Sequence, residues 1–178
     1  MRRMLILLLS VSIMTGCKDK TVPQETAEKK QETRLSRQLP DLHTTDTCHA
    51  GNHEYTYTID RISNDSLGYV IDEFGDKFSA TTLTIGVARD GKSIFRHTFT
   101  KESFKEYLTE DFLDNSIVDG CRFIRVKEGN VYFELAVSYP DSDMSQPFLL
   151  TIAADGSYRV SKDDSLFDED DESYNDGV

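Results

Sequence analysis

Hydrophobic and polar residues alternate along several stretches between residues 46 and 162, and this pattern most strongly limits the folds open to the chain. The alternation is clearest at residues 55–59, 83–87 and 131–137. Because successive side chains of a β-strand point to opposite faces, each stretch predicts a strand with one buried face.

Short turn sequences separate several of these stretches. Asp90-Gly91, Glu128-Gly129-Asn130 and Asp155-Gly156 each stand between two predicted strands. Such dipeptides favour the tight turns of β-hairpins. Three hairpins within so short a span predict an antiparallel sheet.

A helical interruption is expected between the strands. Thr100 can cap a helix over residues 101–108, and residues 110–117 can form a further turn or two. The sequence therefore predicts a mostly β domain, bordering on α+β, with about seven or eight antiparallel strands and one or two short helices. It leaves open whether the sheet forms a sandwich, a half-barrel or a small barrel.

The first sixteen residues have the features of a signal peptide. Arg2 and Arg3 precede an apolar run over residues 4–14, which is too short to span the roughly 30 Å of a bilayer's hydrocarbon. The run is followed by Thr15-Gly16-Cys17. This pattern resembles the lipobox of a bacterial lipoprotein, in which a peptidase cuts before a cysteine that carries acyl chains such as palmitate.

The resemblance implies a membrane anchor on Cys17, and two or three acyl chains would hold a domain on a membrane without a spanning helix. Met14 stands where a lipobox usually has leucine. An ordinary signal peptide or a short anchor that contains a cysteine is the alternative. Lys18 follows Cys17, where an aspartate would favour retention in the inner membrane, so the resemblance implies the outer membrane of the cell envelope.

Composition divides the rest of the chain. Residues 17–45 are rich in charged and polar residues and predict a disordered tether, residues 46–162 form the β-rich domain, and residues 163–178 form an acidic disordered tail. This organisation resembles that of uncharacterised lipoproteins of Bacteroidetes-type bacteria. The resemblance implies no functional residues.

The charge balance limits the partners. The chain has a net charge of −12, and the domain as well as the tail is acidic. Nucleic acids and anionic membrane surfaces are bound mainly by lysine and arginine. We therefore expect no nucleic acid partner, and the acyl chains on Cys17 to provide the contact with the membrane.

After Cys17, two cysteines remain, Cys48 and Cys121. In an oxidising envelope two such cysteines predict one disulfide bond, and two free thiols are the alternative. Neither belongs to a Cys-x-x-Cys pair, so a reactive thiol is not expected.

A group of possible metal ligands surrounds the first of these cysteines: His43, Asp46, Cys48, His49 and His53. Imidazole, thiolate and carboxylate all bind zinc. The spacing matches no known zinc motif, because Ala50-Gly51-Asn52 interrupts a helix between the last two histidines. We interpret the segment as a polar entry loop with weak candidates for a metal site.

Catalytic signals are few. Asp72, Glu73 and Asp76 could supply the carboxylate pair of a glycoside hydrolase, but acidic residues beside Gly75 are also common in turns. His97 has no nucleophilic serine motif to pair with. We expect no catalytic residue and no cofactor.

Three functions stay open. The leading hypothesis is a non-catalytic envelope lipoprotein that binds a protein, peptide, glycan or lipid through its sheet or through the polar loop 140–147. The second is an accessory subunit of an outer-membrane complex, which would expose an apolar patch or an edge strand. The third is an envelope hydrolase, which requires the acidic residues or a histidine to meet in one cleft.

Overall fold

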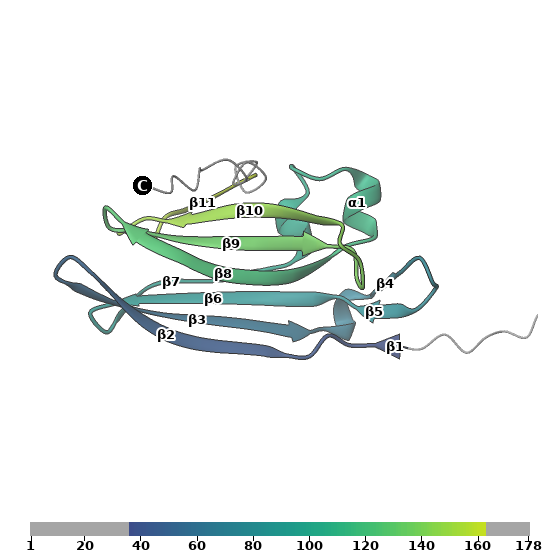
Figure 1. Cartoon of the computed structure of the whole chain (residues 1–178), viewed down its shortest axis with the longest axis horizontal. Helices are drawn as coiled ribbons and strands as arrows, with labels where there is room; N and C mark the ends of the chain where they lie inside the picture. Colours follow the sequence, from purple (N-terminus) through teal and green to yellow (C-terminus); the bar gives the residue numbers. More distant parts are fainter. Residues whose placement is uncertain (1–35, 163–178) are drawn as a thin grey trace, which may run out of the picture. The chain divides into compact units, whose positions relative to one another are not determined.

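The computed structural model describes residues 36–162, and Figure 1 shows how their elements are arranged. The strands are β1 (Ser36–Arg37), β2 (Leu42–Ala50), β3 (His53–Ser63), β4 (Tyr69–Ile71), β5 (Lys77–Ser79), β6 (Thr81–Arg89), β7 (Lys92–Phe99), β8 (Ile117–Lys127), β9 (Asn130–Ser138), β10 (Ser145–Ile152) and β11 (Tyr158–Lys162). The helices are α1 (Glu110–Asp114) and two 3₁₀ turns, η1 (Asp65–Leu67) and η2 (Lys101–Phe104).

Two antiparallel sheets of four strands make up most of the domain, in the orders β2-β3-β6-β7 and β11-β10-β9-β8. Figure 1 shows them as two layers. A third, small sheet has the order β1-β5-β4, with β1 parallel to β5. The predicted mostly β, antiparallel fold is confirmed. Its closure is a sandwich, and the third sheet escaped prediction because its strands have only two or three residues.

The core lies between the two large sheets and follows from the alternation in the sequence. On β9, Val131, Phe133, Leu135 and Val137 are buried, while the residues between them are only partly buried. Tyr57 on β3 contacts the opposite sheet, where its ring stacks on Phe123 with 4.6 Å between the centroids. Burial of these apolar and aromatic side chains stabilises the sandwich.

The predicted hairpin turns are present. Asp90 and Gly91 between β6 and β7 both have positive φ, as do Glu128 and Gly129 between β8 and β9. Two consecutive positive φ angles are the signature of a type I′ turn, whose twist matches that of the flanking strands. The short turn sequences therefore set the strand pairing.

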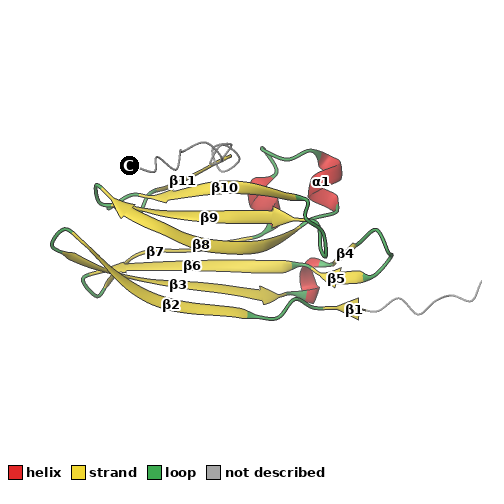
Figure 2. Cartoon of the chain, viewed as in Figure 1, coloured by secondary structure: helices red, strands yellow, loops and turns green. Residues whose placement is uncertain are grey.

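The helical interruption is shorter than predicted. η2 ends at Phe104 instead of reaching residue 108, although Thr100 and Ser103 form the capping box at its start. The Phe104 side chain is fully buried. Figure 2 shows the helical segments at one end of the sandwich. Packing of this aromatic ring against Phe99 and Phe148, rather than a regular helix, holds the segment.

The domain begins earlier than the predicted boundary at Asp46. β2 starts at Leu42 and pairs with β3 throughout its length, and Arg61 donates a hydrogen bond to the Pro40 carbonyl. Backbone pairing orders these residues, and composition does not reveal it. The predicted signal peptide, Cys17, most of the tether and the acidic tail lie outside the described residues.

The turn between β10 and β11 provides a test of the packing between the sheets. Gly156 has a φ of +85°, and a Cβ at this position would lie 2.3 Å from the carbonyl oxygen of Ile94 on β7. We expect Gly156→Ala to lower the free energy of unfolding by about 1–2 kcal/mol through the unfavourable φ, and by about 1–3 kcal/mol more through the clash. Denaturant unfolding measures both.

Gly91→Ala is the matched control, because Gly91 has a φ of +76° and a Cβ added there would meet no other atom within 4 Å. Gly91→Ala should therefore lower the free energy of unfolding only by the contribution from the unfavourable φ. Equal losses in the two variants would contradict the close approach of the turn to β7.

Candidate functional site

A cavity of about 310 Å³ opens at the end of the sandwich that carries α1 and the β4–β5 hairpin. Three segments that are far apart in the sequence line it. They are the end of β4 with the turn after it, the residue that follows α1, and the end of β9 with its loop. The lining residues are Ile71, Asp72, Glu73, Asn115, Tyr139, Pro140, Ser142 and Met144.

The β4–β5 turn forms the first wall. Oδ1 of Asp72 accepts hydrogen bonds from the backbone N–H groups of Phe74 and Asp76, at 3.0 and 2.7 Å. These bonds fold the turn and project Glu73 and Phe74 outward. Oδ2 of Asp72 is buried and has no hydrogen-bond partner within residues 36–162. This oxygen is shielded from solvent, so exposed Glu73 is the carboxylate of this wall that a ligand can reach.

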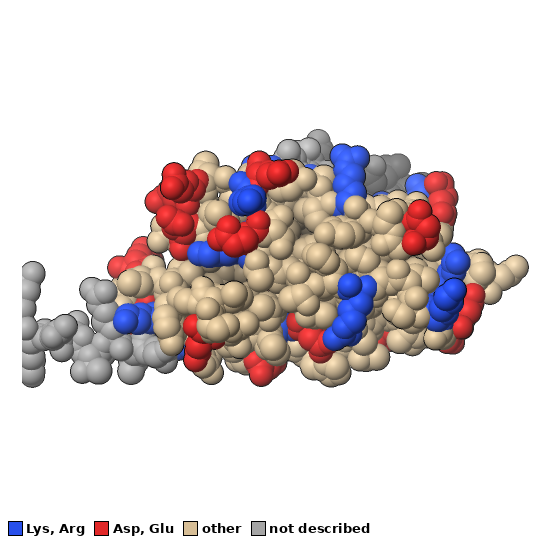
Figure 3. Space-filling model, turned by 180° about the vertical axis from the view of Figure 1, so that it is seen from behind, with Lys and Arg blue, Asp and Glu red and all other residues tan. Residues whose placement is uncertain are grey.

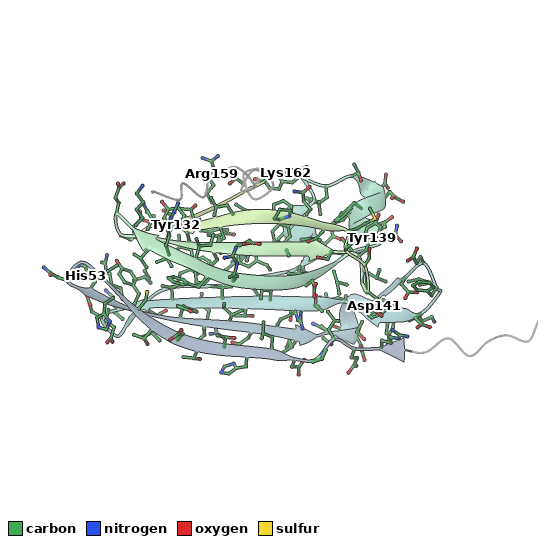
Figure 4. All side chains as sticks on the ribbon, in the orientation of Figure 1. His53, Tyr132, Tyr139, Asp141, Arg159 and Lys162 are labelled. Atoms are coloured by element: carbon green, nitrogen blue, oxygen red, sulfur yellow. The ribbon has the colours of Figure 1, made fainter. Side chains whose placement is uncertain are left out.

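Tyr139 and the loop after it form the opposite wall. The phenol of Tyr139 donates a hydrogen bond to Oδ2 of Asp111, at 3.2 Å. Desolvation, together with the charge of Asp111, raises the pKa of Tyr139 above its ordinary value. The phenol is therefore protonated at neutral pH and serves as a donor. Figure 4 shows Tyr139 and Asp141 at this end of the molecule.

Arg37 on β1 links the two walls. Its guanidinium forms ion pairs with Asp76, at 2.8 Å, and with Asp141, at 2.5 Å. It also lies over the ring of Phe78, 5.7 Å from the centroid. Each exposed ion pair contributes little alone. Together the two ion pairs bridge the β4–β5 hairpin and the loop after β9, which lie on opposite sides of the opening.

Large apolar side chains are exposed at this end of the domain, and two of them, Ile71 and Met144, line the cavity. Of seven exposed large hydrophobic residues in the described part of the chain, five belong to this end: Leu67, Tyr69, Ile71, Phe74 and Met144. Phe74 at the tip of the hairpin is 77% exposed. We call these five residues the apolar rim. Exposed apolar groups gathered in one region often mark an interaction site.

The surroundings are acidic. Figure 3 shows acidic side chains gathered at the end of the molecule that carries α1, whose sequence includes Glu110, Asp111 and Asp114. Among the described residues, neither Asp72 nor Glu73 is in an ion pair with lysine or arginine. The cavity therefore combines an apolar rim with carboxylates that lack a counter-charge.

The predicted acidic residues meet in part. Asp72 and Glu73 both line the cavity, whereas Asp76 is paired with Arg37. No histidine is among the lining residues, and His97 lies on β7, where its ring contacts Phe99 and Tyr158. The polar loop predicted at 140–147 lines the cavity too, but it ends at Met144 because Ser145 begins β10.

The weak metal candidates are not brought together. The segment predicted as a polar entry loop is the β2–β3 hairpin, in which His43 and His49 lie six residues apart on one strand, or roughly 20 Å. Alternation along β2 points Cys48 to the opposite face. Each of the three histidines instead lies beside a carboxylate: His43 beside Asp60, His49 beside Glu54 and His53 beside Asp90.

The carboxylate beside His53 also accepts a backbone hydrogen bond. The N–H of Glu54 and the ring of His53 lower the pKa of Asp90. Within residues 36–162, no three His, Cys, Asp or Glu side chains gather where they could hold a metal ion. Strand geometry, which separates the histidines, explains why the cluster in the sequence is no cluster in space.

The predicted disulfide bond is absent, because Cys48 and Cys121 are both free thiols. They lie on edge strands of different sheets, Cys48 on β2 and Cys121 on β8. The stacked rings of Tyr57 and Phe123 pack between the sheets near this edge. Burial raises the pKa of Cys121 to about 12, which disfavours a reactive thiolate.

Sequence reasoning did not single out Tyr139 or Asn115. Tyr139 ends the predicted strand, and Asn115 lies in a predicted helical turn, so nothing local distinguishes them. Only the meeting of three segments places both in the cavity wall.

Comparison with known proteins gives a family and no established activity. The model of a family described as "Domain of unknown function (DUF4738)" matches residues 21–160. No curated protein matches the chain. No helix within residues 36–162 has the length and apolar character needed to cross a membrane.

Proposed function

The chain belongs to the DUF4738 family of domains of unknown function, and from this premise we propose that it is a non-catalytic lipoprotein of the cell envelope that binds a partner protein or peptide. Cys17 carries the acyl chains, the outer membrane holds them, and the β-sandwich presents the binding site. The apolar rim around the cavity is the observation that supports this function.

The anchor is supported by the N-terminal sequence. The short apolar run and Thr15-Gly16-Cys17 resemble a lipobox. Between Cys17 and Ser36, the first described residue, the chain has enough length to reach roughly 60 Å when extended. The domain can then meet a partner at some distance from the bilayer surface.

The chemistry of the site favours a peptide segment over a small polar ligand. Apolar side chains of a partner can bury the exposed rings and aliphatic groups of the rim, at roughly 25 cal/mol per Å² of apolar surface removed from water. A lysine or arginine of the partner can pair with Glu73, which is exposed and has no ion-pair partner among the described residues.

A hydrolase is a weaker proposal. Oδ1 of Asp72 is occupied by two backbone N–H groups of its own turn, so the residue acts as a structural acceptor. The cavity lining provides no histidine and no cysteine. We therefore propose binding without catalysis.

Crosslinking from the rim tests the proposal. A photoreactive phenylalanine analogue at position 74 of the full-length protein, expressed in its own envelope, should yield a discrete protein adduct on irradiation. The same analogue at Arg96, an exposed position on β7, is the matched control and should yield none. The adduct from position 74 should weaken several-fold when Glu73 is replaced by glutamine.

Equal adducts from both positions, or none from position 74, would contradict a partner at the rim. If Glu73→Gln leaves the yield of the adduct unchanged, the partner contacts the apolar rim, and its proposed ion pair with Glu73 is wrong.

A second candidate function is that of an accessory subunit in an outer-membrane complex, and β2 favours it. This nine-residue strand pairs only with β3 among the described strands and contains no lysine or proline. Unprotected edge strands can accept a strand from another protein. Proline at Thr45 should disrupt such a complex while leaving the crosslink from position 74 intact.

A further inference from the structure

The outer face of the sheet β8–β11 is basic, although the chain as a whole is acidic. Because Val131, Phe133 and Leu135 point into the core, Tyr132 and Glu134 point outward. Strand pairing places Arg122 and Arg125 of β8, and Arg159 of β11, on this same outward face.

One row of residues crosses the whole sheet. Arg125 is directly opposite Tyr132, Tyr132 is opposite Thr151, and Thr151 is opposite Arg159. The guanidinium of Arg125 lies 5.5 Å from the centroid of the Tyr132 ring. Figure 4 shows Tyr132 and Arg159 on the layer that this sheet forms. Cross-strand pairing therefore aligns two cations with an aromatic ring between the outer strands.

The charges on this face are unbalanced. Its basic residues are Arg122, Arg125, Lys127 and Arg159, and its acidic residue is Glu134, which pairs with Arg122. Arg125, Lys127 and Arg159 have no ion-pair partner within residues 36–162. Glu128 and Asp155 lie in turns at the end of the sheet. We call the four cations with Tyr132 the basic face.

An acidic segment follows this sheet directly in the sequence. β11 ends at Lys162, and the next sixteen residues contain eight acidic and no basic residues. Extended, they reach roughly 50 Å, whereas four strands spaced at about 4.8 Å place β8 only about 15 Å from β11. The segment is long enough to cover the whole basic face from its point of attachment.

We infer that the acidic segment Asp163–Val178 binds to the basic face of its own chain. The two charge sets are complementary, and the covalent link gives an effective concentration on the order of millimolar. Several weak, exposed ion pairs can then act together where a single pair would contribute little. Binding shields the basic face from anionic partners, and salt weakens it because the pairs are exposed.

This inference does not rest on the proposed partner site. The basic face and the cavity share no residue, so either can fail without the other.

A single tryptophan provides the test, because the chain contains none. In the full-length protein, Tyr174→Trp places this fluorophore in the acidic segment. We expect its fluorescence anisotropy to be high at about 10 mM salt and to fall toward that of a free peptide at about 1 M salt, where the screening length shrinks to about 3 Å. The anisotropy at low salt should not depend on protein concentration.

Charge reversal on the basic face separates this contact from general electrostatics. Adding Arg125→Glu and Arg159→Glu should abolish the salt-dependent change. Adding Arg96→Glu, at an exposed site on the other sheet, should leave it intact. Circular dichroism shows whether the charge-reversal variant is folded. If it is unfolded, the milder substitutions Arg125→Gln and Arg159→Gln replace it.

Three results would overturn the inference. Anisotropy that is low at every salt concentration would show that the segment is unbound. If Arg96→Glu lowers the anisotropy as much as the double charge reversal does, the acidic segment is attracted by the charge of the whole domain and not by the basic face. Anisotropy that rises with protein concentration would assign the contact to a second copy of the chain.

Discussion

Replacing Phe133 by alanine is expected to lower the free energy of unfolding by about 3–5 kcal/mol, the usual cost of deleting a buried aromatic ring. Phe133 is fully buried on β9, and its ring lies 5.7 Å from those of Tyr57 and Phe123. The variant therefore leaves a void between the sheets. Thermal unfolding should show a loss of roughly 10 °C or more in Tm.

Phe74→Ala is the matched control for this prediction. It removes the same ring from the tip of the β4–β5 hairpin, where the side chain is 77% exposed. Its effect on stability should stay within about 0.5 kcal/mol, while the proposed partner binding is lost. A cost below about 1 kcal/mol for Phe133→Ala would contradict the packing of the two sheets.

Replacing Cys17 by serine is expected to abolish acylation of the protein and to leave its signal peptide attached. Serine has no thiol to acylate, and each buried methylene of an acyl chain contributes about 0.8 kcal/mol to membrane attachment. Labelling with a palmitate analogue measures the loss of the acyl chains. The signal peptide should also stay uncleaved, which mass spectrometry of the N-terminus detects.

Cys48→Ser is the control for the anchor, because it removes a thiol from β2 and leaves Cys17 in place. It should keep both the membrane location and the palmitate label. If Cys17→Ser kept the palmitate label, or if the wild-type protein carried none, the lipobox interpretation would be wrong, and a short uncleaved anchor would replace it.

Cys48 and the three histidines near it show why proximity in sequence does not by itself make a metal site. A strand advances about 3.3 Å per residue and turns successive side chains to opposite faces. Cys48 and His49 therefore point to opposite faces of the sheet. His43 lies far from His49 along the same strand. The pairing of Cys48 with Cys121 depends on the distance between sheets, which no sequence pattern contains.

The cavity gives the opposite case, since part of it could be predicted. The polar loop predicted at 140–147 and the acidic turn with Asp72, Glu73 and Asp76 both stood out as candidates, one for binding and one for catalysis. Their sequence separation hid the fact that they face each other. The ion pairs of Arg37 with Asp76 and Asp141 bridge the two segments at this opening.

Local patterns alone determined the strands of the two large sheets except β2, the type I′ turns of their hairpins and the one-sided burial of β9, because alternation and turn conformation depend on neighbouring residues. The tertiary structure decided which segments meet. It brought the hairpin at Phe74 beside the loop at Tyr139, kept Cys48 and Cys121 apart, and aligned Arg125 with Arg159 on one face of an acidic chain. These outcomes depend on strand order and sheet packing, which arise from contacts between residues distant in sequence.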